Sequence, residues 1–239
     1  MAKKFKDFIQ RDKPKKRGAR QHKKIKISTR SVRKNRRYTR DKEKDSLSLI
    51  PENFIFVKKY NNINSLKEKV LKYTKEDWHK YDYRQKNYMV HMNTKTIPLI
   101  WNEMDKYNQR NLEKDNRKFW PEADNYKTEL ESLSQILTEK YGEGFITSAL
   151  LINLPSRSII APHVDNQDAY FDLVKRTHLA IISDDEVRFI VGGEDKNIKE
   201  GEIFEINNNE KLHEVKNNSE IDRIHLLTDW LTIKGERNE

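Results

Sequence analysis

The residues best suited to chemistry are an imidazole and a carboxylate two positions apart, His163 and Asp165, in the segment 162–165. In an extended chain, side chains at positions i and i+2 project to the same side, so both groups can reach one point in space. A second histidine, His213, can supply a third ligand and leave half of an octahedral ion's positions open. Two histidines and one carboxylate with open positions are the coordination pattern of non-haem Fe(II) oxygenases. The three residues therefore form a candidate metal site.

Arg223 is the fourth residue of interest, because it follows His213 by ten positions in an apolar stretch that is typical of a strand. Such a strand would carry the guanidinium inward, where a buried cation needs a carboxylate, and a small dicarboxylate cosubstrate would provide one. Zinc on the same three ligands is the rival occupant, and it would imply hydrolysis by an activated water molecule. That reaction has no need of an internal site for a dicarboxylate, so Fe(II) is favoured.

Charge is distributed unevenly along the 239 residues. Residues 1–44 hold 20 Lys/Arg against 4 Asp/Glu, a net of +16, whereas the remainder has a net of −6. Like charges repel and large apolar residues are scarce in the first segment, so we predict a disordered basic arm over 1–45 and a globular body over 46–239. We expect the arm to contact nucleic acid or a nucleoprotein particle, with a solubilising or targeting tail, or a contact with an acidic protein, as the alternatives. The residues expected to make the contact are Lys15, Lys16, Arg17, Lys23, Lys24, Arg33, Arg36 and Arg37.

The composition excludes several classes of protein. Without cysteine, the chain has no disulfide framework, no thiolate metal site and no cysteine nucleophile. No apolar run approaches the roughly 20 residues that span a bilayer, and the amino terminus lacks the apolar segment of a signal peptide. We therefore expect a cytoplasmic protein with no membrane partner.

The secondary structure that must position these residues changes at Gly144, from mixed helix and strand before it to strands after it. Before it, in a lead-in of residues 46–143, we predict a strand over 54–57, a helix over 65–73 that a capping box opens at Ser65, and a helix over 125–141 ended by Gly142. The segment 96–101 is extended, and its Pro98 favours an edge strand or a loop. From Gly144 to residue 232 we predict strands, without helices between them, over 145–154, 157–161, 177–182, 187–191, 203–206 and 223–231. This regular spacing indicates an antiparallel sandwich or barrel.

Five segments of this second half carry a family resemblance. They are Pro-His-Val-Asp (162–165), Arg-Thr-His-Leu (176–179), Gly-Glu (201–202), His-Glu-Val-Lys-Asn (213–217) and Arg-Ile-His-Leu-Leu-Thr-Asp (223–229). Their order and spacing resemble those of the aspartyl/asparaginyl β-hydroxylase family of Fe(II)- and 2-oxoglutarate-dependent dioxygenases. The resemblance covers about residues 144–230, continues more weakly over 94–101, and leaves the basic arm outside it. It implies a double-stranded β-helix, the jelly-roll or cupin-like architecture, in a mainly β protein with flanking helices (α+β).

The resemblance also implies roles for six residues. His163 and His213 would be iron ligands and Asp165 the carboxylate ligand, although some members of the family have no acid at this position and use two histidines only. The residues expected to hold 2-oxoglutarate are Arg223, at its distal carboxylate, together with Arg176 and His178. For Arg176 the alternative is an ion pair with a nearby acid. No catalytic residue is expected beyond the metal ligands.

The implied reaction consumes 2-oxoglutarate and O2, yields succinate and CO2, and hydroxylates an unactivated C–H bond of a protein or amino-acid substrate. The basic arm extends the range of substrates to a nucleoprotein particle or nucleic acid. The alternative function is a non-catalytic, nucleic-acid-associated structural protein that retains the jelly roll. The intact ligand set and Arg223 favour the enzyme. The remaining histidines, including His91 and His225, are interpreted as ordinary hydrogen-bonded residues, and Asp229 as a turn residue or a neighbour of the site.

Overall fold

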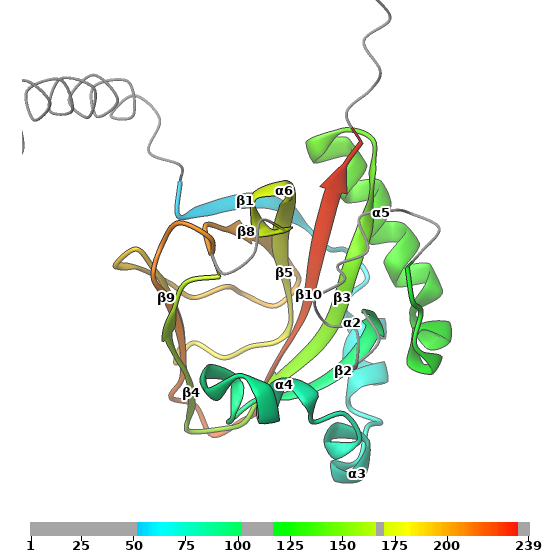
Figure 1. The fold of residues 1–239 in the computed structure, drawn as a ribbon. Helices are drawn as coiled ribbons and strands as arrows, with labels where there is room; N and C mark the ends of the chain where they lie inside the picture. Colours follow the sequence, from blue (N-terminus) through cyan, green and yellow to red (C-terminus); the bar gives the residue numbers. More distant parts are fainter. Residues whose placement is uncertain (1–51, 102–116, 166–169, 234–239) are drawn as a thin grey trace, which may run out of the picture. The chain divides into compact units, whose positions relative to one another are not determined.

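The structure is a computed structural model of the chain and describes residues 52–101, 117–165 and 170–233. The basic arm, with all eight residues predicted to contact nucleic acid, lies outside these ranges. Two antiparallel sheets form the body (Figure 1). The larger sheet has the order β1 (Phe54–Lys59), β8 (Glu202–Ile206), β5 (Val174–Ile182), β10 (Arg223–Thr232), β3 (Gly144–Leu154) and β2 (Lys95–Ile100). The smaller has the order β4 (Ser158–His163), β9 (His213–Asn217), β6 (Val187–Val191) and β7 (Glu194–Lys196).

The predicted class, a mainly β protein with flanking helices and a jelly-roll core, is confirmed. The expectation of no helix between the strands after Gly144 is wrong, because the short helix α6 (Tyr170–Leu173) lies between β4 and β5. Both edges of the larger sheet come from the lead-in, because β1 pairs with β8 and β2 pairs with β3. Pro98 lies in β2, at an edge, as its missing N–H predicts. No helix within the described ranges is long and apolar enough to cross a membrane.

Several of the helices, but not residues 83–91, cover the face of the larger sheet that is turned away from the smaller sheet (Figure 1). The longest, α5 (Lys127–Tyr141), buries one apolar stripe in a cluster that also holds residues of β3 and β10, and ends at Gly142, whose φ of 88° suits glycine. Each fully buried leucine of that stripe contributes about 1.5–3 kcal/mol of transfer free energy. The stripe consists of Leu130, Leu133 and Leu137.

The lead-in contains further short helices. They are α2 (Ile63–Val70), α3 (Lys75–His79), α4 (Tyr83–Asn87), η1 (Met89–His91) and η4 (Pro121–Tyr126). The helix predicted over 65–73 begins two residues earlier, and no side chain caps it at Asn62, so the capping box expected at Ser65 is wrong. A capping box does form at Thr74 and Asp77, where it opens α3.

β10 is buried on both faces, and its odd-numbered and even-numbered residues point to opposite faces of the sheet. Ile224, Leu226 and Trp230 pack into the cluster beneath the helices. The alternate positions, Arg223 and Leu227 among them, belong to the opposite face, between the two sheets. The neighbouring strand β5 follows the same rule, and this common inner face carries the polar residues of the site.

Candidate metal centre and cosubstrate pocket

The three predicted metal ligands converge where the smaller sheet ends. His163 is the last residue of β4 and His213 the first of β9, and the two are direct partners in the pairing of these strands. Their ring centroids are 4.1 Å apart. Asp165 follows two residues later, and one ligand atom from each residue lies within 4.8 Å of the others.

Backbone carbonyls fix the tautomers of both imidazoles. His163 Nδ1 lies 2.7 Å from Ala161 O, and His213 Nδ1 lies 3.3 Å from Lys211 O. A carbonyl only accepts, so each Nδ1 carries a proton, and Nε2 is the ring nitrogen left to bind a metal. The two Nε2 atoms lie 3.6 and 4.0 Å from carboxylate oxygens of Asp165. Burial lowers the pKa of His213 to about 4, so this ring is neutral at neutral pH, and the donor set fits Fe(II).

The Asp165 carboxylate has one oxygen engaged by the protein. Oδ2 accepts hydrogen bonds from Arg176 Nη1 (2.6 Å) and Asn208 Nδ2 (2.8 Å). Burial alone would raise the pKa of Asp165, but the charge of Arg176, with His213 and the bond from Asn208, brings it well below its usual range. The group is therefore ionised. Its Oδ1 lies 3.6 Å from His163 Nε2, whereas His213 Nε2 lies 4.0 Å from Oδ2.

Arg223 is a buried cation. Its side chain is 1% exposed, and Nη2 donates to His225 Nδ1 at 2.6 Å. The guanidinium carbon lies 5.6 Å from the Phe189 ring centroid. Within the described ranges, no carboxylate forms an ion pair with it, and burial lowers the pKa of Arg223 to about 9. Burying an uncompensated charge is unfavourable, so this group favours binding of an anion.

One pocket holds the metal ligands and Arg223 together. The pocket lies between the two sheets and opens to solvent. Its empty volume, including the part that is open to solvent, is about 460 Å³. Its polar lining residues are Arg84, His91, His163, Asp165, Arg176, His178, His213 and Arg223. Its apolar lining residues are Ile152, Ile160, Phe189, Ile206, Val215 and Leu227. An apolar cavity with a few convergent polar groups is the usual form of a small-molecule site.

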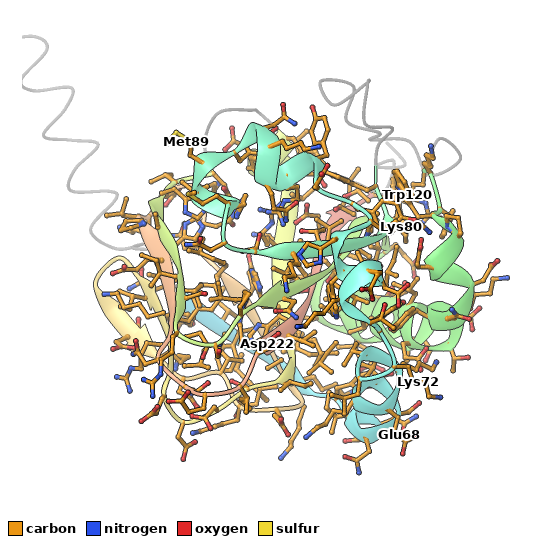
Figure 2. All side chains as sticks on the ribbon, turned by 90° about the horizontal axis from the view of Figure 1, so that it is seen from below. Glu68, Lys72, Lys80, Met89, Trp120 and Asp222 are labelled. Carbon is orange, nitrogen blue, oxygen red and sulfur yellow. The ribbon has the colours of Figure 1, made fainter. Side chains whose placement is uncertain are left out.

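α4 and η1 provide a part of the pocket wall that the sequence does not predict. His91 was interpreted as an ordinary residue, yet its ring centroid lies 5.5 Å from that of His163, and its Nε2 accepts from Arg84 Nη2 at 2.8 Å. Burial, followed by the charge of Arg84, holds the pKa of His91 well below its usual value. On the same segment, Met89 is 86% exposed and lies at the outer edge of the molecule in Figure 2. No periodic pattern marks residues 76–91, so the sequence offers no signal for this wall.

The two other residues expected to hold the cosubstrate lie on the inner face of β5. His178 is buried in the pocket, and burial, then the charge of Arg223, lowers its pKa well below the usual value. Arg176 contacts two carboxylates, Asp165 and Asp229. In the structure, Arg176 therefore forms ion pairs with acids, as the alternative interpretation predicts.

The neutral state of His225 leads to a prediction for pH. Burial and the adjacent Arg223 hold the pKa of His225 well below its ordinary value, whereas in the unfolded chain it is about 6.5. Only the unfolded chain takes up this proton as pH falls below about 6.5, so the parent loses about 1.4 kcal/mol of stability per pH unit from this group. His225→Asn keeps an acceptor for Arg223 and removes the titration. Urea unfolding at pH 7 and pH 5.5 should show a smaller loss of stability in the variant. Equal losses would contradict the assignment.

The chain is similar to one protein family and to several solved structures. A family model described as aspartyl/asparaginyl β-hydroxylase matches residues 57–232. Comparison with curated proteins finds no match. Among solved structures, the chain is similar to an oxidoreductase of the 2OG-Fe(II) oxygenase family from Burkholderia pseudomallei, with 14% identity, coverage of 80% of this chain and 89% of that one, and a TM-score of 0.49. It is also similar to a Pseudomonas putida prolyl-4-hydroxylase, with 11% identity, coverage of 80% and 97%, and a TM-score of 0.48.

The family match spans most of the body, from within β1 to the end of β10, and so includes both sheets and every residue that lines the pocket. The enzyme class and cofactors expected from the sequence, a 2-oxoglutarate-dependent hydroxylase that uses Fe(II) and O2, are confirmed by this match. The chain belongs to the aspartyl/asparaginyl β-hydroxylase family.

Proposed function

We propose that His163, Asp165 and His213 hold Fe(II) and that Arg223 binds the distal carboxylate of 2-oxoglutarate in the same pocket. The observation that carries this proposal is the buried guanidinium of Arg223, which has no carboxylate partner within the described ranges and lines the pocket of the three ligands. When bound, iron and 2-oxoglutarate supply an oxidative decarboxylation that yields succinate and CO2 and inserts one oxygen atom of O2 into a C–H bond.

The side chains of the pocket have separate tasks in this proposal. The imidazoles offer lone pairs whose direction the carbonyls of Ala161 and Lys211 set. Apolar side chains such as Phe189 and Leu227 exclude water and strengthen the attraction between Arg223 and a carboxylate. His178 is neutral and lies beside Arg223, where it can donate or accept a hydrogen bond without adding charge.

We further propose a protein or amino-acid substrate, reached in the cell through a nucleoprotein particle. Membership of the family supports the substrate class, and the net charge of +16 in residues 1–44 supports the contact with nucleic acid. The arm and the pocket would then have separate roles, one in localising the enzyme and one in the reaction.

Turnover tests the proposed activity directly. Purified protein with Fe(II), 2-oxoglutarate and O2 should form succinate, and should form more in the presence of a substrate-containing cell extract. Mass spectrometry of the extract should then reveal a component heavier by one oxygen atom, only when 2-oxoglutarate is present. Protease or nuclease treatment of the extract before the assay would show which class of macromolecule carries the product. No succinate under any of these conditions would refute the proposal.

Deleting residues 1–45 should abolish binding to RNA and DNA at moderate salt, because counterion release by lysine and arginine supplies most non-specific affinity. Fluorescence anisotropy over a range of salt concentrations measures this, and the parent's log affinity should fall with a slope of about −0.7 to −0.9 per neutralised phosphate. An arm of the same composition in scrambled order is the control and should retain binding. The proposed contact is wrong if the deletion variant binds as tightly as the parent.

A further inference from the structure

Arg176 joins two carboxylates that lie far apart in the sequence. Its Nε and Nη2 donate to Asp229 Oδ1 (2.7 Å) and Oδ2 (2.8 Å), and its Nη1 donates to Asp165 Oδ2 (2.6 Å). Arg176 and Asp229 are direct partners in the pairing of β5 with β10, so the first contact is built into the register of the sheet. The guanidinium carbon also lies 4.7 Å from the Phe171 ring centroid. All three guanidinium nitrogens are thus engaged by acids.

Asp229 is a rigid anchor for this guanidinium. Its side chain is 0% exposed, and Oδ2 also accepts a hydrogen bond from Tyr170 OH at 2.9 Å. Thr147 Oγ1 lies 2.7 Å from the same hydroxyl and donates to the backbone oxygen of Asp229 at 3.1 Å. A bidentate, charge-assisted pair inside a buried network of this kind holds a planar guanidinium in one orientation.

Asp165 depends on side chains for its orientation. The pairing of β4 with β9 reaches His163, and Asp165 lies two residues beyond it. Its N–H donates to Asn208 O at 2.8 Å, but this bond leaves the side-chain torsions of Asp165 unset. The two donors on Oδ2, from Arg176 and Asn208, fix the carboxylate beside both imidazoles, with Oδ1 facing His163 and Oδ2 lying 4.0 Å from His213 Nε2.

We propose that Arg176 is a positioning residue, which acts through Asp165 to hold the carboxylate ligand in place for the metal, with Asp229 as its anchor. This inference rests on the proposed metal site. It assigns Arg176 a task different from binding the cosubstrate, since its charge is already balanced by two acids. Arg223, which no acid contacts within the described ranges, is then left as the cation for the cosubstrate.

Cobalt binding to the metal-free protein, without cosubstrate, tests the role of Arg176. Arg176→Lys keeps a cation beside Asp229 but loses the planar fork that reaches Asp165. Titration with Co(II), followed by its absorption spectrum, should show affinity weakened about 10- to 100-fold, as for other groups that orient a ligand. In an Asp165→Ala background the same substitution should have no further effect. Arg188→Lys, in an exposed bidentate pair with Asp195, is the matched control and should bind Co(II) like the parent.

Two results would overturn the inference. One is parental Co(II) affinity in Arg176→Lys, with binding of 2-oxoglutarate to the cobalt-loaded protein weakened instead. The other is an equal loss of Co(II) affinity in the parent and Asp165→Ala backgrounds. If Arg176→Lys does not fold, Asp229→Asn takes its place, because it weakens the contact that orients Arg176. Its affinities for Co(II) and for 2-oxoglutarate are then measured in the same way. Co(II) binding without succinate formation by the parent would refute the proposed function alone, whereas failure of the parent to bind Co(II) would refute both.

Discussion

Replacing His213 by alanine should abolish succinate formation and weaken Co(II) binding by more than about 100-fold, the upper range seen for losing a group that only orients a ligand. The reason is geometric, because His213 supplies one of three donor atoms that lie within 4.8 Å of one another. His163→Ala should have the same effect. Both losses are measured on the same preparations, by succinate formation and by Co(II) titration.

His79→Ala is the matched control for these variants. His79 lies in α3, and its side chain does not line the pocket. This variant should retain both activity and metal affinity. Turnover in His163→Ala and His213→Ala at the parent's rate would rule out the proposed site.

Replacing Arg223 by methionine should have opposite effects on stability and on cosubstrate binding. Binding of 2-oxoglutarate should weaken by about 2–5 kcal/mol, roughly 30- to several-thousand-fold, because the distal carboxylate would then be buried without a counter-ion. The cosubstrate-free protein should gain about 1–4 kcal/mol, because an apolar side chain of similar length replaces an uncompensated buried charge. Calorimetric titration and urea unfolding measure the two effects.

Arg188→Met provides the comparison for this second experiment. Arg188 pairs with Asp195 at the surface, so its loss should change the free energy of unfolding by about 1 kcal/mol or less and leave cosubstrate affinity unchanged. A destabilised Arg223→Met protein that binds 2-oxoglutarate as tightly as the parent would show that Arg223 has a purely structural role.

The sequence predicts the main strands because their burial leaves continuous apolar runs. β3 is the central example, since it is covered on two faces and differs little from the predicted range 145–154. β10 also differs little from its predicted range, 223–231, although Arg223, His225 and Asp229 interrupt its apolar residues. The i, i+2 spacing of His163 and Asp165 also predicts that both can reach one point, although β4 ends at His163 and side chains orient Asp165. Gly192 and Gly193 join β6 to β7 with φ values of 57° and 85°, conformations that favour glycine.

Features that depend on tertiary contacts could not be predicted from the sequence. β9 was not predicted as a strand, because its polar and apolar residues alternate over only five positions, His213–Asn217. The partner of Arg176 was ambiguous, since several acids lie near it in sequence, and pairing of β5 with β10 selects the distant Asp229. The roles of the basic arm and its boundary with the body remain predictions.

Because the side chains of β10 alternate between the two faces of the sheet, the enzyme can be active only when β10 pairs in the correct register. Arg223 and Asp229 face the pocket side of the sheet because they are odd-numbered residues of β10. The even-numbered Leu226 and Trp230 face the helices. A slip of a single residue against β3 or β5 would send the guanidinium beneath the helices and turn leucines towards the ligands. Misregistered molecules would thus be inactive as well as poorly packed, so selection for turnover also acts against this folding error.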